Sequence, residues 1–187
     1  SFSSKKRRAS RTLLDILFNY LVRWLAPSLI FTCEEAWKSR GNDSSIHLEE
    51  FLVADIKYKN VDLAEKWEKI KNVRKVITGA LEKKRFDKTI GSSLEAHVDI
   101  YLTSDYDSIQ ENINIADIAI TSSATLIPMT TSNENSIFQL GFSHDEVKGV
   151  SVIVKKATGL KCDRCWKILE EVTSTQNICN RCKEAIN

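Results

Sequence analysis

The first third of the chain has the apolar spacing of two amphipathic helices. In residues 11–26 the apolar side chains recur at steps of three or four and form one stripe: Leu13, Leu17, Leu21, Trp24 and Leu25. Pro27 should end this helix, because proline has no backbone N–H to donate to the preceding turn. Thr32 and Glu35 have the spacing of a capping box, which predicts that a second helix begins at Thr32. The composition of residues 40–61 predicts an irregular connection.

A longer helix is predicted over residues 62–88. Its apolar positions also recur at steps of three or four: Leu63, Trp67, Ile70, Val73, Ile77 and Leu81. Asp62 can cap its first turn, with Glu65 three residues further on. The helix is about 40 Å long at its usual rise per residue, and Lys and Arg crowd its other face. Such a rod can lie along several phosphates of a nucleic acid, although a helix of an ordinary bundle has the same pattern.

Beyond Gly91 the pattern changes to alternation, with frequent β-branched residues. The alternating stretches are residues 94–100, 113–120, 137–142 and 150–154. Residues 107–112 can form a helical turn between them. These signals predict a small mixed α/β unit over residues 92–158. The fold class is therefore α+β, with a helical bundle over residues 1–91, this unit, and a short module over residues 159–187.

Charges are unevenly distributed along the chain, although the net charge of its 187 residues is only +2. Residues 1–40 carry eight Lys and Arg against three acids, and residues 66–88 carry nine against three. Residues 89–147 contain nine acids and no Lys or Arg. This asymmetry predicts that the basic segments meet a polyanion and that the acidic segment faces away from it. Solvated helix faces would give single charge runs of the same kind.

The composition is that of a globular protein, with 42% hydrophobic and 28% charged residues. No apolar run approaches the roughly 20 residues needed to span a bilayer. The basic start is not followed by a signal-peptide pattern with a small-residue cleavage site. We therefore expect a cytoplasmic protein without membrane contact. The chain does not start with methionine, and we expect it to be a fragment of a longer protein.

Four of the five cysteines form two C-x-x-C pairs separated by thirteen residues: Cys162, Cys165, Cys179 and Cys182. Each pair can form a knuckle with both thiolates directed to one centre, and two knuckles close a tetrahedron around Zn²⁺. An iron centre of similar geometry and a pair of disulfides are the alternatives. Because sulfur fills all four positions, no place is left for a water nucleophile. The spacing thus predicts one structural zinc in a zinc-ribbon-like module.

The residues beside the cysteines point to RNA. The module has little apolar content, so metal binding should be coupled to its folding. Arg164 and Trp166 flank Cys165, and Arg181 lies within the second knuckle. A guanidinium fork suits a phosphate, and an indole plane suits an unpaired base. Alternatively, Trp166 is the core of the module and the arginines are ordinary solvated side chains.

No catalytic residue is predicted in this chain. Cys33 has no neighbouring histidine and is expected to be a buried structural cysteine. His47, His97 and His144 are scattered, without a partner at metal-ligand or triad spacing. Neither glycine-rich phosphate-loop pattern occurs. The residues alone therefore favour a binding module.

Three groups of motifs occur in an order that resembles a known family. LAP at residues 25–27 with FTCEEAW at residues 31–37 is similar to the anticodon-binding helical domain of class I synthetases for isoleucine, valine and leucine. ALE at residues 80–82 with IGSSLEA at residues 90–96, and CDRCW at residues 162–166 with the second knuckle, resemble bacterial-type isoleucyl-tRNA synthetases. The valyl enzymes end in a coiled-coil arm, for which no sustained heptad exists here.

This resemblance implies a parent isoleucine–tRNA ligase that uses ATP and Mg in catalytic regions upstream. The family's ATP-site signatures H-x-G-H and K-M-S-K-S are absent from these residues. The present part would bind the anticodon arm of the isoleucine-specific tRNA, attached to the rest of the synthetase chain in a monomer. Unpaired anticodon bases can be stacked and read at their edges. RNA contacts are expected at three places: Arg164, Trp166 and Arg181; Lys83, Lys84 and Arg85; and Lys6, Arg7 and Arg8.

Two other classes of function stay open at this point. A free-standing zinc-ribbon adaptor that binds nucleic acid or protein would carry the same knuckles. A hydrolase would need convergent titratable residues in a pocket, and the sequence supplies no obvious set. An upstream reading frame with the ATP-site signatures would separate the synthetase from the adaptor.

Overall fold

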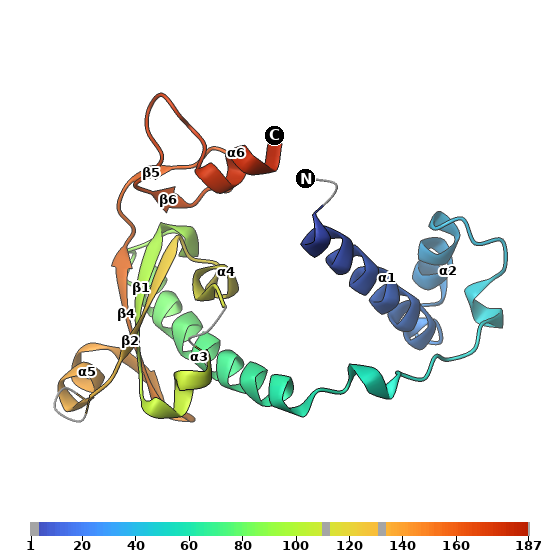
Figure 1. Ribbon diagram of the computed structural model, residues 1–187, viewed down its shortest axis with the longest axis horizontal. Coiled ribbons are helices and arrows are strands. Elements are labelled where there is room, and N and C mark those ends of the chain that lie inside the picture. The colour runs from blue at the N-terminus through green and yellow to red at the C-terminus, as the bar shows by residue number, and fades with distance from the viewer. Residues whose placement is uncertain (1–3, 110–112, 131–133, 187) are drawn as a thin grey trace. The chain divides into compact units, whose positions relative to one another are not determined.

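The chain folds into two compact units. A computed structural model describes residues 4–109, 113–130 and 134–186 (Figure 1). Its contacts divide the chain into Ser1–Lys59 and Asn60–Asn187. The expected boundary at residue 91 lies inside the second unit, because the long helix shares its core with the sheet. Within the described part of the chain, no helix is both long and apolar enough to cross a membrane.

The first unit consists of two α-helices and two short 3-10 helices. These are α1 Lys5–Leu25, α2 Ile30–Ser39, η1 Ile46–Leu48 and η2 Ile56–Tyr58. Its small core consists of Val22, Ala26, Cys33, Trp37 and Ile46. The indole N–H of Trp37 donates to the carbonyl of Ser44 at 3.1 Å, so the loop after α2 is held against that helix. Cys33 is buried, as expected.

The predicted capping box at Thr32 is wrong. Helix α2 begins at Ile30 without a side-chain cap, so Thr32 lies within the helix. The carboxylate of Glu34 instead accepts hydrogen bonds from the hydroxyl of Ser45 at 2.8 Å and from the N–H of Ile46 at 2.9 Å. These bonds tie α2 to the following loop, a long-range role that a local capping pattern does not reveal.

The apolar stripe predicted on α1 is only partly covered within the first unit. Its side chains keep 44–54% of their surface exposed: Leu13, Leu17, Leu21, Trp24 and Leu25. The buried residue of α1 is Val22, which lies beside the stripe. Periodicity therefore located the helix correctly but did not identify the face that forms this unit's core.

The second unit contains a four-stranded sheet, its helices and the four-cysteine module. Its elements are α3 Val61–Phe86, η3 Ser93–Glu95, β1 Ala96–Leu102, η4 Ser104–Ile109, α4 Ile115–Ala119, β2 Ser123–Pro128, α5 Glu134–Leu140, β3 Phe142–His144, β4 Val147–Lys156, β5 Leu160–Lys161, β6 Ile168–Leu169 and α6 Asn180–Ile186. The strand order is β2-β1-β4-β3, and β5 pairs separately with β6. Strand β1 is parallel to β2 and antiparallel to β4. Helix α3 runs along one face of the sheet (Figure 1).

Helix α3 forms much of the core of the second unit. Its buried side chains are Ile70, Val73, Val76, Ile77, Ala80 and Leu81. They pack against inward-facing residues of β1 and β4 such as Val98 and Val152. Gly79 permits the close approach of β3, because a Cβ atom there would lie 2.6 Å from the ring of Phe142.

The N-terminal part of α3 differs from the prediction in two ways. Leu63 and Trp67 remain 50% and 44% exposed, so the apolar face is buried only from Ile70 onward. The cap is Asn60 and not Asp62, because the side-chain oxygen of Asn60 accepts from the N–H of Leu63 at 2.9 Å. The chain therefore enters the helix one residue earlier than expected, at Val61.

Two of the alternating stretches are strands and two are not. Residues 94–100 and 150–154 contribute to β1 and β4, as predicted, whereas residues 113–120 and 137–142 largely form α4 and α5. The side chain of Asn114 caps α4, and Ile120 ends it in the left-handed region with φ 56°. Strand β2 follows at Ser123–Pro128 and was not predicted. Of the predicted turn over residues 107–112, the first three residues belong to η4, and residues 110–112 lie outside the described residues.

Replacing Ile77 with alanine tests the packing of α3 on the sheet. Ile77 is 1% exposed, and such a truncation should cost about 2–5 kcal/mol. Hydrogen exchange of the β1 amides should therefore become faster. The matched control is Leu63→Ala on the exposed first turn of the same helix, which should leave β1 unchanged. Unaltered exchange in β1 of the Ile77→Ala protein would contradict this packing.

Candidate metal centre and nucleic-acid interface

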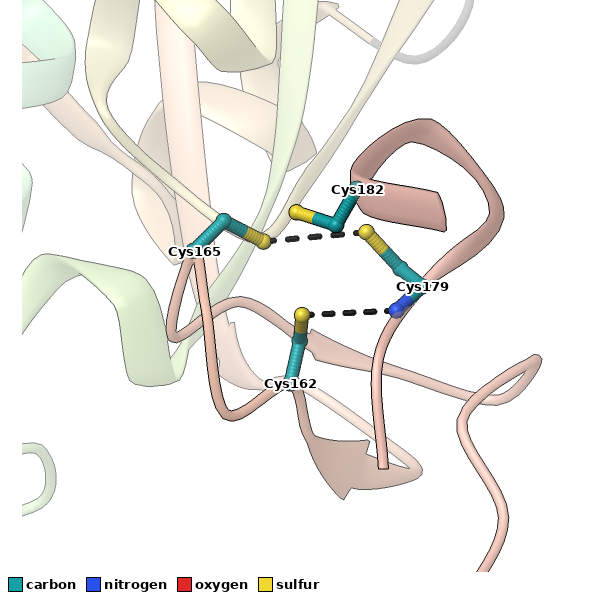
Figure 2. A group of neighbouring side chains, drawn as sticks. All are labelled: Cys162, Cys165, Cys179 and Cys182. Atoms are coloured by element: carbon teal, nitrogen blue, oxygen red, sulfur yellow. Dashed lines mark hydrogen bonds between the residues drawn. The ribbon is translucent and has the colours of Figure 1, made fainter. Parts of the chain in front are cut away.

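The four sulfur atoms of the C-terminal module converge on one centre. Cys162 and Cys165 lie on the turn after β5, Cys179 immediately precedes α6, and Cys182 lies in its first turn. Figure 2 shows all four side chains turned inward, and their sulfur atoms lie within 4.8 Å of one another. The Sγ atoms of Cys165 and Cys179 are 3.7 Å apart. A tetrahedron with metal–sulfur distances of about 2.3 Å has edges of about 3.8 Å, so the group can hold one metal ion.

Backbone hydrogen bonds shape the first knuckle. The N–H of Trp166 donates to the carbonyl of Cys162 at 2.9 Å, and the N–H of Cys162 donates to the carbonyl of Lys167 at 2.9 Å. The N–H of Cys179 donates to Sγ of Cys162 at 3.3 Å (Figure 2). The tight turn places Trp166 at φ 66°, in the left-handed region. The direction of the indole is thus set by the same turn that positions the sulfur atoms.

Electrostatics of the thiols favour a cation at their centre. Burial raises the pKa of Cys162, but backbone N–H groups at Cys165, Cys179 and Arg164 outweigh it and lower that pKa to about 6. Burial and the neighbouring thiols raise the pKa of Cys179 to about 12, and burial also raises the pKa of Cys165. The cluster without a cation therefore favours one thiolate over several. A divalent ion supplies the charge that lets all four ionise.

The module's core consists mainly of its cysteines. Its buried cluster contains Cys162, Cys179, Cys182 and Val172, and Cys165, Leu169 and Ile178 pack against it. Hydrophobic burial this small is insufficient to hold a fold of this length. A metal ion bound by the four cysteines would supply the stability that this small core lacks.

Trp166 does not belong to that core. Its side chain is 60% exposed, so the alternative in which it fills the interior of the module is wrong. The ammonium of Lys161 lies over the indole, 5.1 Å from the ring centre. Both side chains line a hollow of about 540 Å³ between the module and the end of the sheet.

Arg164 and Arg181 come together on another face of the module. With Cys165 and Cys182 they line a hollow of about 410 Å³, so that one arginine of each knuckle borders it. Both side chains are exposed. Two converging guanidinium groups can bind a phosphate through paired hydrogen bonds.

Asp117, on α4, holds the module against the rest of the second unit. Its Oδ1 is 2.6 Å from Nζ of Lys167 and 3.1 Å from Nη1 of Arg181. The hydrogen bond from Lys167 lowers the pKa of Asp117; burial opposes this shift and the charge of Arg181 adds to it. The hydroxyl of Ser122 makes a further link, donating to the carbonyl of Leu94 and accepting from the N–H of Ile168 at 2.7 Å.

Sequence reasoning missed both Asp117 and Ser122. Asp117 falls in the stretch predicted to be a strand, and its partners lie 50 and 64 residues further along the chain. Ser122 is a short polar residue between apolar segments, with no motif to distinguish it. Only the packing of α4 against the module reveals their roles.

The basic residues of α3 have two kinds of surroundings. Along the helix, Lys75 pairs with Glu146 and Lys69 donates to the carbonyl of Asp105 at 2.6 Å. Part of the charge asymmetry in the sequence is therefore compensated inside the second unit. At the end of the helix, Lys83 is exposed, Lys84 is half-buried and Arg85 pairs with Glu82.

The N-terminal basic cluster belongs to the first unit. Lys6, Arg7 and Arg8 lie in the first two turns of α1 and are exposed. Arg8 borders a hollow of about 650 Å³ together with Arg11 and Arg40. This cluster and the cysteine module belong to different units.

The expectation that no histidine has a partner at triad spacing is wrong for His97. Its Nδ1 lies 2.7 Å from Oγ of Ser123 and its Nε2 lies 2.9 Å from Oδ1 of Asp99. Lys155 reaches the other oxygen of Asp99 at 2.6 Å. Burial raises the pKa of Asp99, but the hydrogen bonds from Lys155 and His97 outweigh it, so the pKa is lowered. These four side chains join β1, β2 and β4 on the face of the sheet away from α3.

Known proteins are similar in sequence to this chain over nearly its whole length. Residues 1–100 match the family model described as the anticodon-binding domain of tRNA ligase. The chain is 43% identical over 174 residues to an isoleucine–tRNA ligase of Bartonella henselae, an alignment that covers 92% of the chain and 17% of the relative. Identity to the enzymes so named of Gluconobacter oxydans and Agrobacterium fabrum is 39% and 45%, over 99% and 92% of the chain and 18% and 17% of those relatives. The chain thus spans less than a fifth of the length of these relatives. The match to more than half of its residues shows that the chain belongs to the family of tRNA-ligase anticodon-binding domains.

Proposed function

We propose that this chain is the tRNA-binding C-terminal part of an isoleucine–tRNA ligase and that it binds the anticodon arm of the isoleucine-specific tRNA. The family match and the identity of 39–45% to isoleucine–tRNA ligases over nearly the whole chain support this assignment. The observation that carries it is the exposed indole of Trp166 on the same metal-site turn as Arg164. A free-standing adaptor is not favoured, because nearly the whole chain aligns with proteins named isoleucine–tRNA ligase.

The full enzyme joins isoleucine to its tRNA with ATP and Mg in regions that the match does not cover. The residues of this chain contribute binding to that reaction. They hold the anticodon arm of the tRNA while its acceptor end reacts in the catalytic regions of the full enzyme. The parent enzyme is proposed to act as a cytoplasmic monomer. This part of the chain alone should catalyse no isoleucine-dependent pyrophosphate exchange.

The metal in the cysteine cluster is proposed to be a single structural zinc. Four thiolates in tetrahedral arrangement are the ligand set of structural zinc sites. Since all four positions are occupied by protein sulfur, the ion is left no open position for a water nucleophile. Its role is then to fix the two knuckles, and with them Arg164, Trp166 and Arg181.

RNA contacts are proposed on three surfaces. Trp166 stacks on an unpaired base, and Arg164 and Arg181 bind phosphate at the two knuckles. Arg181 shares its guanidinium with Asp117, so Arg164 is the stronger phosphate ligand of the two. The end of α3 and the start of α1 contribute phosphate contacts through two further sets: Lys83, Lys84 and Arg85; and Lys6, Arg7 and Arg8. Such contacts position the RNA but do not read its sequence.

Metal analysis tests the proposed zinc. Protein purified without added metal should contain about one equivalent of zinc, because four preorganised thiolates bind this ion tightly. The Cys179→Ser protein should lose it, and the Cys33→Ala protein, altered at the cysteine of the first unit, should keep it. Free thiols or disulfides with less than about half an equivalent of zinc would contradict the proposal.

Substitution of Trp166 and Arg164 tests the RNA surface. Because the indole is 60% exposed, Trp166→Ala should keep zinc and fold. It should weaken tRNA binding by roughly 5- to 150-fold, the equivalent of one stacked base. Arg164→Ala should also weaken binding and lower the dependence of affinity on salt. The measurement is the dissociation constant for the isoleucine-specific tRNA over a range of salt concentrations.

Lys183→Ala is the matched control for both substitutions. It removes a positive charge from exposed α6 without altering either hollow of the module. It should reduce affinity less than Arg164→Ala does. If all three proteins bind tRNA like the parent chain, the module is not the RNA surface.

A further inference from the structure

The hollow beside Trp166 is bordered by three separate segments of the second unit. The turn of η3 contributes Leu94 and Glu95, the end of β4 contributes Lys156, and the cysteine module contributes Lys161, Trp166 and Ile168. Its volume of about 540 Å³ falls within the range of pockets that bind small molecules. An aromatic plane, two ammonium groups and one carboxylate therefore face a shared space.

The walls of this hollow are fixed by hydrogen bonds between its segments. Ser122 is 4% exposed, and its hydroxyl joins the backbone of Leu94 on one wall to that of Ile168 on the other. The N–H of Ala157 donates to the carbonyl of Glu95 at 2.7 Å, which joins β4 to the turn. Lys167, between Trp166 and Ile168, is held by Asp117. The hollow is thus formed before a ligand enters, and little ordering is needed on binding.

Glu95 lines this hollow, and its carboxylate lies against Gly91. Its Oε2 accepts a hydrogen bond from the N–H of Gly91 at 2.9 Å. The other oxygen, Oε1, has no hydrogen-bond partner among the described residues. Oε1 therefore stays available as an acceptor for a ligand with an N–H group that enters the hollow.

These groups together match one unpaired nucleotide. A base can stack on the indole when Lys161, whose ammonium lies over the ring, turns from the ring to a phosphate of the nucleotide. The exposed ammonium group of Lys156 can pair with a phosphate as well. Oε1 of Glu95 accepts from an exocyclic amino group, which adenine, guanine and cytosine carry. Uracil carries carbonyl oxygens at the positions of these amino groups, and its one donor on that edge is the ring N3–H. A carboxylate oxygen placed to accept from the exocyclic amino group therefore faces a carbonyl oxygen of uracil, and two acceptors facing each other in a partly closed site are unfavourable.

We propose that Glu95 is a specificity-determining residue that selects an unpaired base with an exocyclic amino group in the hollow beside Trp166. This inference rests on the proposed tRNA binding and adds to it the chemical identity of the base. Glu95 acts through hydrogen bonding and Trp166 through stacking. The first decides which base is accepted and the second decides how tightly any base is held.

The experiment pairs base changes with a change of Glu95. The probe is a stem-loop RNA with the anticodon arm of an isoleucine tRNA. In turn, each loop cytidine is replaced by uridine and each loop adenosine by inosine, which exchanges the amino group for a carbonyl. Each loop guanosine is replaced by inosine, which removes the amino group. The unaltered 187-residue chain should lose on the order of 10-fold in affinity at one loop position, because a hydrogen bond to a charged group is lost there.

Glu95→Gln gives the sharper readout. If the amide carbonyl takes over the hydrogen bond from Gly91, the NH₂ group faces the hollow and donates where the carboxylate accepted. The penalty at that position should therefore disappear, and it should reverse where the replacement base carries a carbonyl in place of the amino group. Zinc content and hydrogen exchange of β1 should match the unaltered chain, which shows that the variant is folded. Glu184→Gln removes the same charge from α6, and its pattern of base preferences should match that of the unaltered chain.

Two negative outcomes are distinguishable. If no loop position discriminates, or if Glu95→Gln retains the same preference, the role of Glu95 is refuted. When Trp166→Ala and Arg164→Ala still weaken binding in that case, the proposed RNA surface stands and only the base selection fails. When those variants also bind normally, the tRNA surface fails together with this inference.

Discussion

In the proposed zinc centre, the C-terminal module depends on the attraction between four clustered sulfur atoms and a central cation. Its core contains four cysteines and few aliphatic side chains, so hydrophobic burial contributes little to its stability. With burial and neighbouring thiols raising the pKa of Cys179 to about 12, the cluster does not ionise fully by itself. A divalent ion removes that obstacle and adds metal–sulfur bonds. The positions of Arg164, Trp166 and Arg181 follow from the knuckles that the ion closes.

The proposed RNA-binding surface requires that the module keep a fixed position on the rest of the second unit. Asp117 and Ser122 connect it to α4 and to the end of the sheet, and the sheet in turn packs on α3. One continuous set of contacts therefore leads from the long helix to the cysteine cluster. Residues matched by the anticodon-binding family extend through α3 and into β1. The family boundary at residue 100 consequently falls inside a single packed unit.

Features with a local cause were predictable from sequence. The C-x-x-C spacing alone brings two sulfur atoms to one point, and the periodicity of α3 indicates a face that is buried from Ile70 onward. Short apolar stretches were ambiguous. Helix α4, capped at its start by Asn114 and ended by Ile120, has the sequence pattern of an alternating strand. The contacts divide the chain after Lys59 and not near residue 91, because α3 packs on the sheet, and the residues of α3 alone do not reveal this packing partner.

Residues whose roles arise from tertiary contacts were not predictable. Asp117 and Ser122 have ordinary neighbours in sequence and acquire their partners only when α4 and the end of the sheet meet the module. The partner of His97 was unpredictable for the same reason, because the pairing of β1 with β2 brings Ser123 beside it on the face of the sheet away from α3. By contrast, the exposure of Trp166 follows from a local turn, but two readings of that residue fitted the sequence equally well.

The most direct test of this account is the affinity of the chain for the isoleucine-specific tRNA before and after removal of zinc. If the ion fixes the surface that carries Arg164 and Trp166, a reduced protein treated with a zinc chelator should bind at least about 10-fold more weakly, since the loss includes a stacked base. Returning one equivalent of zinc should restore the original affinity. Equal affinity of the zinc-free and zinc-loaded forms, with the zinc content of each verified, would contradict the claim that the metal centre organises RNA recognition.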